Sequence, residues 1–448
     1  MIEKLYKSKL YPLVFQILSL LIFTLLVLGA INVTTSDPAL VKQLRNTNLS
    51  NLIVWSYWWP VIVLTAVFFG RHWCSICPIE LLSAIANRIG LKRKVPKFLK
   101  SGWMITIFYA FIAIVAIHTW GIHRYPNLMA YYLLSLMGLA VILSIIYEKR
   151  AFCSYLCPVG KLLGLYSLLS HFGIRVKNQV TCHSCKTKDC ISKENQYKLI
   201  GRSCSSNLYP ANITDNRTCI LCTQCVKSCS NNNITLKRIK SSYQNFDLKK
   251  LLWSEIGMLM VLLGFVCYEN LSSWETSNTI IRFIPSHLNK LIGSEAIPYG
   301  LFEALILFLL VPAIFMGFIS FLLKVNGKTS WKQSLQKLAI HLLPLVAFGH
   351  VFKALLKTSS RIPYWQYALE QPDGLQYANL IFNKEIALNP LAWVNNLVLV
   401  LGILGLCYAT YISVKKVSKT DPGKWILYIT ILFHLVIFLI GPISSLFQ

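Results

Sequence analysis

The sequence predicts an all-α polytopic membrane protein of about nine transmembrane helices, interrupted by a small α+β insert. Hydrophobic residues make up 55% of its 448 residues, charged residues only 14%, and the mean hydropathy is +0.54. Such a chain is too apolar for a soluble protein of this size. Nine apolar stretches are also long enough to cross a hydrocarbon layer of ~30 Å. They are residues 11–31, 52–70, 101–120, 129–147, 251–268, 299–323, 336–357, 391–413 and 425–444.

Membrane topology, rather than nucleic-acid binding, explains the net charge of +27. Lys and Arg gather in short segments beside the apolar stretches, as the positive-inside rule requires of cytoplasmic loops. Lys4, Lys7 and Lys9 therefore place the N-terminus in the cytoplasm. Alternation of the nine spans then leaves the insert cytoplasmic and the C-terminus external. The expected surroundings are a lipid bilayer, and no nucleic-acid partner is expected.

Eight of the fourteen cysteines lie in the insert, in two groups between residues 180 and 240. The first group is Cys182-x2-Cys185-x4-Cys190-x13-Cys204, and the second is Cys219-x2-Cys222-x2-Cys225-x3-Cys229. The second group has the spacing of bacterial ferredoxins, in which three thiolates bind one [4Fe-4S] cluster and the fourth crosses to a neighbouring cluster. Two such groups in one short segment predict two clusters.

The crossing rule gives each cluster three cysteines of one group and one of the other. The first cluster takes Cys182, Cys185, Cys190 and Cys229, and the second takes Cys219, Cys222, Cys225 and Cys204. The pattern departs from ferredoxins in the long interval before Cys204 and in Ser230, which stands where ferredoxins have Pro. Zinc and a disulfide framework are the alternatives. The third closely spaced cysteine, Cys225, favours iron-sulfur because a zinc knuckle does not need it.

An internal repeat contains two Cys-Pro motifs. Each unit is an apolar span, a basic residue, an aromatic-Cys-Ser triplet, a Cys-Pro pair, an amphipathic helix and a basic tail. Pro78 and Pro158 suit the first turn of a helix, whose positive end favours a thiolate. Because two spans separate the repeats, both motifs face the cytoplasm, and their thiols predict a third iron-sulfur centre. Its ligands are Cys74, Cys77, Cys153 and Cys157. Redox-active dithiols and inert structural turns are the alternatives.

The last third of the chain carries histidines inside predicted spans, His341 and His350 in one and His434 in another. Ionisable residues within a membrane are functional candidates, so these three are candidates for a haem or quinone site. His350 shares a helix face with Lys353 and Lys357, which suits a quinone head group, a haem or snorkelling cations. Hydrogen-bonded core histidines are the alternative.

These features predict three domains. An N-terminal membrane domain (1–177) holds both Cys-Pro motifs, a cytoplasmic two-cluster ferredoxin-like domain follows (178–245), and a five-helix membrane domain (246–448) completes the chain.

Over roughly residues 50–240 the chain resembles the membrane-bound polyferredoxins. That family includes NapH, the ferredoxin-type membrane subunit of periplasmic nitrate reductase systems, and the C-terminal half of NosR. The resemblance rests on two Cys-Pro motifs followed by ferredoxin groups, although the first motif has two intervening residues where the family commonly has three. It implies a multi-pass protein of the bacterial inner membrane that transfers electrons or supports the maturation of a periplasmic reductase.

We therefore predict a membrane-bound iron-sulfur protein that is an electron-transfer subunit rather than a stand-alone enzyme. It would relay electrons between a soluble cytoplasmic redox partner or the quinone pool and a respiratory or periplasmic redox partner. A partner subunit or an external reductase is expected. The alternatives are a maturation factor that supplies reducing equivalents to an external metalloenzyme, and a redox sensor.

Overall fold

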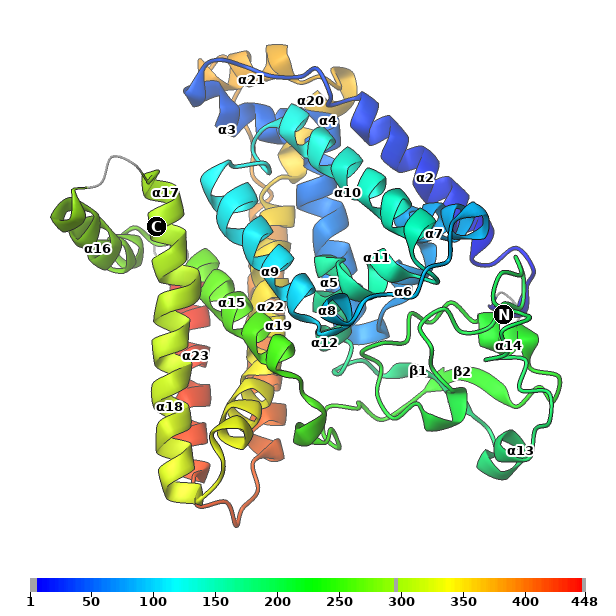
Figure 1. Cartoon of the computed structure of the whole chain (residues 1–448). Helices are drawn as coiled ribbons and strands as arrows, with labels where there is room; N and C mark the ends of the chain where they lie inside the picture. Colours follow the sequence, from blue (N-terminus) through cyan, green and yellow to red (C-terminus); the bar gives the residue numbers. More distant parts are fainter. Residues whose placement is uncertain (1–5, 294–296, 445–448) are drawn as a thin grey trace. The chain divides into compact units, whose positions relative to one another are not determined.

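The computed structural model describes residues 6–293 and 297–444, and these residues are mostly helical (Figure 1). Lys4, used above to orient the N-terminus, lies outside the described residues. The chain forms two compact units, and the boundary between them cuts through three helices. Unit 1 comprises the described residues of Met1–Val33, Val61–Ile105 and Asn127–Phe246. Unit 2 comprises the described residues of Thr34–Pro60, Thr106–Pro126 and Asp247–Gln448.

Within the described part of the chain, seven helices are long and apolar enough to cross a membrane. They are Leu49–Phe69, Pro126–Ile146, Trp253–Leu271, Tyr299–Gly327, Trp331–Glu370, Ala392–Lys416 and Lys424–Gly441. The predicted spans 11–31 and 101–120 fall on two shorter apolar helices, Leu13–Leu28 and Trp103–Thr119. The membrane character of the chain is thus confirmed, whereas the count of nine spans stays a prediction.

Unit 1 contains short helices and one small sheet. Its helical segments are α2 (Leu13–Leu28), α6 (His72–Ile76), α7 (Pro78–Ile89), α8 (Lys97–Lys100), α10 (Pro126–Ile146), α11 (Ala151–Tyr155), α12 (Pro158–Tyr166), α13 (Gln179–His183), η3 (Pro210–Asn212) and α14 (Gln224–Ser228). Two further helices, α5 (Trp59–Phe69) and α9 (Trp103–Phe111), contribute residues to both units, and the first residue of α10, Pro126, belongs to unit 2.

The sheet of unit 1 closes the cysteine-rich insert. Strands β1 (Phe172–Val176) and β2 (Ile234–Arg238) pair antiparallel, with Phe172 opposite Arg238 and Val176 opposite Ile234 (Figure 1). One strand precedes the first cysteine group and the other follows the second. Their pairing therefore brings the two ends of the insert together.

The internal repeat is visible as two matching pairs of helices in unit 1. In each repeat a short helix, α6 or α11, ends just before the Cys-Pro pair, and a longer helix, α7 or α12, begins at the proline. Pro78 and Pro158 occupy the first helical position, where their missing N–H would have no partner in the helix. The predicted helix after each Cys-Pro pair is confirmed. It places Cys77 and Cys157 at positive helix ends.

Unit 2 contains the remaining long helices. Its segments are α3 (Pro38–Thr47), α4 (Leu49–Leu52), η1 (Ile53–Trp58), η2 (Ile112–Thr119), η4 (Leu248–Lys250), α15 (Trp253–Leu271), α16 (Glu275–Ile292), α17 (Tyr299–Leu305), η5 (Ile306–Leu310), α18 (Val311–Gly327), α19 (Trp331–Ser359), η6 (Ile362–Tyr364), α20 (Trp365–Glu370), α21 (Leu375–Phe382), α22 (Ala392–Lys416) and α23 (Lys424–Ser444). Of these, η1, η2 and η5 are π-helical.

Helix α19 is the core of unit 2. A capping box starts it, because Ser330 Oγ accepts the Gln333 N–H while the Gln333 side chain accepts the Ser330 N–H. The helix is buried around most of its circumference and packs against α15, α18, α22 and α23. Gly402 of α22 lies against the ring of Phe352, which a Cβ at that position would overlap. A small residue there lets the two helices approach closely.

Candidate iron-sulfur centres

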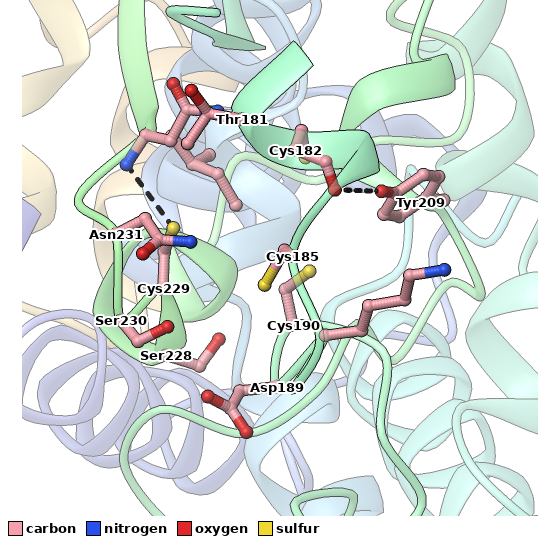
Figure 2. A pocket seen from close by; sticks show the side chains of 13 residues that line it. Thr181, Cys182, Cys185, Asp189, Cys190, Tyr209, Ser228, Cys229, Ser230 and Asn231 are labelled. Carbon is pink, nitrogen blue, oxygen red and sulfur yellow. Dashed lines mark hydrogen bonds between the residues drawn. The ribbon is translucent and has the colours of Figure 1, made fainter. Parts of the chain in front are cut away.

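Four cysteines of the insert line one solvent-open pocket of about 330 Å³. They are Cys182, Cys185, Cys190 and Cys229. Figure 2 shows Cys185 and Cys190 on one wall of the pocket and Cys229 on the other. The pocket therefore joins three cysteines of the first group with the last cysteine of the second, which is the first predicted set.

Local hydrogen bonds position the walls of this pocket. The side chain of Asn178 starts α13 by accepting the backbone N–H of Val180 at 2.8 Å. The Tyr209 hydroxyl donates to the carbonyl of Cys182 at 2.7 Å, and the backbone N–H of Asn233 donates to Cys229 Sγ at 3.3 Å (Figure 2). N–H···S bonds of the last kind stabilise a thiolate and tune an iron-sulfur cluster.

The electrostatics of the pocket show that its thiols lie close to one another. Burial, and secondarily the sulfurs of Cys182, Cys229 and Cys185, raise the pKa of Cys190 to about 12. Cys185 differs because hydrogen bonds from the Lys188 backbone and the Thr187 hydroxyl lower its pKa. The two thiols thus have pKa values shifted in opposite directions, and Cys185 ionises more readily than Cys190.

The second set of insert cysteines surrounds a tightly wound loop. Leu221 and Thr223 adopt left-handed backbone conformations, with φ of +57° and +58°. Non-glycine residues adopt this conformation rarely and at a cost, and such residues cluster at ligand sites. Alternating left-handed residues turn successive backbone N–H groups toward one side, which is the geometry that binds anions. The loop lies between Cys219 and Cys225 and is therefore shaped for an anionic group.

The thiols around this loop also lie within electrostatic range of one another. Burial is the main cause that raises the pKa of Cys225 well above its ordinary value. The nearby sulfurs also raise this pKa, in the order Cys222, Cys219, Cys204 and Cys190. Cys204, whose ligand role depended on the crossing rule, thus lies with the second group. Its sulfur accepts the backbone N–H of Leu208 at 3.4 Å.

The two Cys-Pro motifs bring four further thiols together. Burial raises the pKa of Cys77 well above its ordinary value, and the sulfurs of Cys153, Cys74 and Cys157 contribute in that order. Burial also raises the pKa of Cys153 to about 11 and that of Cys157 to about 12. Cys157 Sγ accepts the backbone N–H of Gly160 at 3.3 Å, at the start of α12. Two cysteines from each repeat therefore meet at one place in unit 1.

The surroundings of these thiols suit iron-sulfur clusters. Among residues 6–293 and 297–444, no group of three Cys, His, Asp or Glu side chains that could hold one metal ion is found. In a [4Fe-4S] cluster, four thiolates bind four different irons. Soft thiolates, helix N-termini and N–H···S bonds are the donors and dipoles that such clusters use.

Three charged residues near the Cys-Pro thiols have no role predicted from the sequence. Arg71 Nη2 lies 3.6 Å from Cys74 Sγ. Arg150 lies within electrostatic range of Cys153 and forms an ion pair with Glu80, which is 1% exposed. The signal that could have indicated the arginines is the repeated spacing Arg-x-x-Cys, which appears once in each repeat.

The three candidate histidines of unit 2 each have different partners. His341 Nδ1 lies 2.6 Å from the Lys337 carbonyl, and His434 Nδ1 lies 2.8 Å from the Thr430 carbonyl, so each bonds to its own helix. His350 Nε2 accepts the indole N–H of Trp59 at 3.4 Å. These contacts fit core histidines, and the haem or quinone role stays a prediction.

Comparison with known proteins finds an iron-sulfur family profile that covers the Cys-Pro repeats. A family profile described as "4Fe-4S binding domain" matches residues 51–96 and 129–177, which contain the two Cys-Pro motifs. The resemblance to membrane-bound polyferredoxins is confirmed. No solved structure matches the chain.

Two relatives are described as an electron-transport and a ferredoxin-type protein. The putative electron transport protein YccM of Escherichia coli is 25% identical over 246 residues, 48% of this chain and 65% of that protein. The methylamine utilization ferredoxin-type protein MauN of Paracoccus denitrificans is 25% identical over 170 residues, 34% of this chain and 58% of that protein. Protein NirI of the same organism is 28% identical over 154 residues, 29% of this chain and 23% of that protein. The chain thus spans less than two thirds of each of these three relatives.

Proposed function

We propose that this protein is a membrane-bound electron carrier with three [4Fe-4S] centres in unit 1. The outer insert centre has the ligands Cys182, Cys185, Cys190 and Cys229; the inner insert centre has Cys204, Cys219, Cys222 and Cys225; and the Cys-Pro centre has Cys74, Cys77, Cys153 and Cys157. The main support for this proposal is that four thiols from the two repeats lie within electrostatic range of one another, in the segments that match a 4Fe-4S domain.

The contacts among the three sets support a relay with the inner insert centre in the middle. Cys190 of the outer centre lies within electrostatic range of Cys225 of the inner centre. Arg150 interacts with Cys204 of the inner centre and with Cys153 of the Cys-Pro centre. One electron could therefore pass through the three centres in series, because each has the next one as its neighbour.

The insert surface is suited to a negatively charged redox partner. Lys186, Lys193 and Lys198 are exposed on the loops around the outer centre. A basic surface attracts an acidic protein such as a flavodoxin or a ferredoxin and speeds its encounter. By the positive-inside rule this partner is cytoplasmic. A quinone or an external redox partner would then exchange electrons with the membrane side of the relay.

Stopped-flow reduction of the anaerobic protein by reduced ferredoxin tests this function. We expect cluster bleaching at a rate that falls as the ionic strength rises. The variant Lys186→Glu/Lys193→Glu should slow the reaction roughly tenfold at low salt. Lys415→Glu in unit 2 is the matched control and should leave the rate unchanged. No bleaching of iron-loaded protein by any one-electron donor would contradict the electron-carrier function.

A cell lacking the protein separates electron transfer from maturation. If external donors restore the partner enzyme's activity, the protein is an electron carrier. If the partner enzyme lacks its metal and artificial donors do not restore it, the maturation role replaces our proposal.

A further inference from the structure

The two repeats place an arginine at the same position of each Cys-Pro motif. Arg71 stands three residues before Cys74, and Arg150 stands three residues before Cys153. Each arginine immediately precedes its short helix, α6 or α11, and the two are 7% and 6% exposed. A buried guanidinium is stable only beside anionic or hydrogen-bonding groups. Two equivalent buried arginines at one site indicate a shared role.

Arg71 reaches from the first repeat to the second. Its Nη2 lies 3.6 Å from Cys74 Sγ, and its Nη1 donates to the carbonyl of Arg217 at 2.7 Å. A Cβ added to Gly160 of α12 would lie 3.1 Å from Arg71 Nη2 and 3.6 Å from Cys157 Sγ. The glycine therefore leaves room for the guanidinium beside a cysteine of each repeat.

Arg150 occupies the corresponding position on the other side of the Cys-Pro centre. It lies within electrostatic range of Cys153, and its Nη1 donates to Ser206 Oγ at 3.2 Å. It also pairs with the Glu80 carboxylate, which pairs in turn with Arg202. Arg150 thus contacts a Cys-Pro cysteine and the loop that carries the inner insert centre.

The charges around the Cys-Pro centre and the outer insert centre differ. Arg71 lies against Cys74, and Arg150 pairs with the Glu80 carboxylate, which also pairs with Arg202. These three guanidiniums outnumber the one carboxylate, so positive charge is in excess among these largely buried residues. Apart from cysteines and Tyr209, the ionisable side chains that line the pocket of the outer centre are one cation, Lys188, and one anion, Asp189. That pocket is open to solvent, which screens both charges.

Electron uptake adds a negative charge to a cluster that four thiolates already make anionic. Nearby buried cations stabilise the reduced form and raise the reduction potential, whereas burial alone lowers it. Two guanidiniums next to the sulfurs outweigh burial because they interact directly and are poorly screened.

We propose that Arg71 and Arg150 raise the reduction potential of the Cys-Pro centre above that of the outer insert centre, and so set the direction of electron flow. This inference rests on the proposed function. One electron from a soluble one-electron donor reduces the insert; the insert is then reoxidised as that electron passes to the Cys-Pro centre. Both arginines act as positioning residues that hold positive charge, and neither gains nor loses a proton.

Redox titration monitored by EPR tests the order of potentials in the whole protein. Cys185→Ser and Cys157→Ser identify the signals of the outer insert centre and the Cys-Pro centre. In the wild-type protein we expect the Cys-Pro signal to appear at the higher potential. The reverse order overturns the inference, and this measurement needs no change at either arginine.

Substitution of Arg71 tests the cause of that order. Arg71→Gln keeps a donor for the Arg217 carbonyl but removes the charge, and should favour the oxidised Cys-Pro centre at least tenfold, about 59 mV for one electron. Arg71→Lys keeps the positive charge and should therefore retain most of the wild-type reduction potential. Arg88→Gln on α7, where Arg88 donates to the Tyr197 carbonyl, is the charge-matched control and should leave the potential unchanged.

The outcomes separate the inference from the proposed function. If iron, sulfide and three EPR signals are intact in Arg71→Gln and the potential is unchanged, the inference is wrong and the electron-carrier function stands. If the wild-type protein binds no clusters, the proposed function itself fails.

Discussion

Replacing Glu80 by Gln should destabilise unit 1 through the loss of one buried charge. Glu80 is 1% exposed and pairs with both Arg150 and Arg202, so it neutralises two cations at once. Removing one member of a buried ion-pair network costs about 3–5 kcal/mol, because the remaining charges are left uncompensated. For a unit of roughly 200 residues this corresponds to a fall in Tm of roughly 6–20 °C.

Thermal unfolding of the detergent-solubilised protein, followed by circular dichroism at one fixed scan rate under anaerobic conditions, measures the effect. Glu194→Gln is the control because Glu194 is an exposed residue of the insert. Removing Arg202 as well, in Glu80→Gln/Arg202→Gln, should recover part of the loss by reducing the excess of positive charge. If Glu80→Gln and Glu194→Gln lower Tm equally, the buried network does not stabilise unit 1 and the reasoning is refuted.

Three further predictions concern other parts of the chain. Cys157→Ser should lower the iron content by about four per chain, whereas Cys407→Ser should leave it unchanged. Gly374→Ala should lower Tm by several degrees, because the φ of Gly374 is +73° and a Cβ there would overlap the backbone of Thr47. The control is Gly317→Ala, because a Cβ at Gly317 would meet no other atom within 4 Å. Burial, and secondarily Arg45, hold the pKa of His123 well below its ordinary value, so its folded form stays neutral. Unfolding lets this residue bind a proton, so stability should fall as pH drops below about 6.5, and less so in His123→Gln.

Each of these predictions has a clear opposing result. Full iron content in Cys157→Ser would remove that residue from the ligand set. Equal Tm values for Gly374→Ala and Gly317→Ala would show that the turn tolerates a side chain. Identical losses of stability between pH 7 and pH 5.5 in the wild-type protein and His123→Gln would show that this histidine is not held neutral.

Much of unit 1 could be predicted because its signals are local. Pro78 and Pro158 fix where α7 and α12 begin, whatever the tertiary context. The spacing rule for the insert cysteines predicted that Cys204 and Cys229 would each serve the other group. Cys229 lines the pocket of the first group, and Cys204 lies within electrostatic range of Cys225. The binding of clusters by these cysteine sets stays a prediction.

Other features depend on contacts that a linear pattern does not contain. Glu80 and Arg202 are 122 positions apart, and nothing in either segment indicates that they pair. A hydropathy window also overestimates the length of the first helix, because Pro12 precedes α2 and Gly29 ends it. Hydropathy measures composition, whereas helix ends depend on individual residues that break or cap the backbone.

The most direct test of the account is the iron, acid-labile sulfide and zinc content of the anaerobically purified protein. Three [4Fe-4S] centres predict about twelve irons and about twelve sulfides per chain, with no stoichiometric zinc. About eight irons would contradict the Cys-Pro centre, and zinc without labile sulfide would contradict the iron-sulfur account altogether.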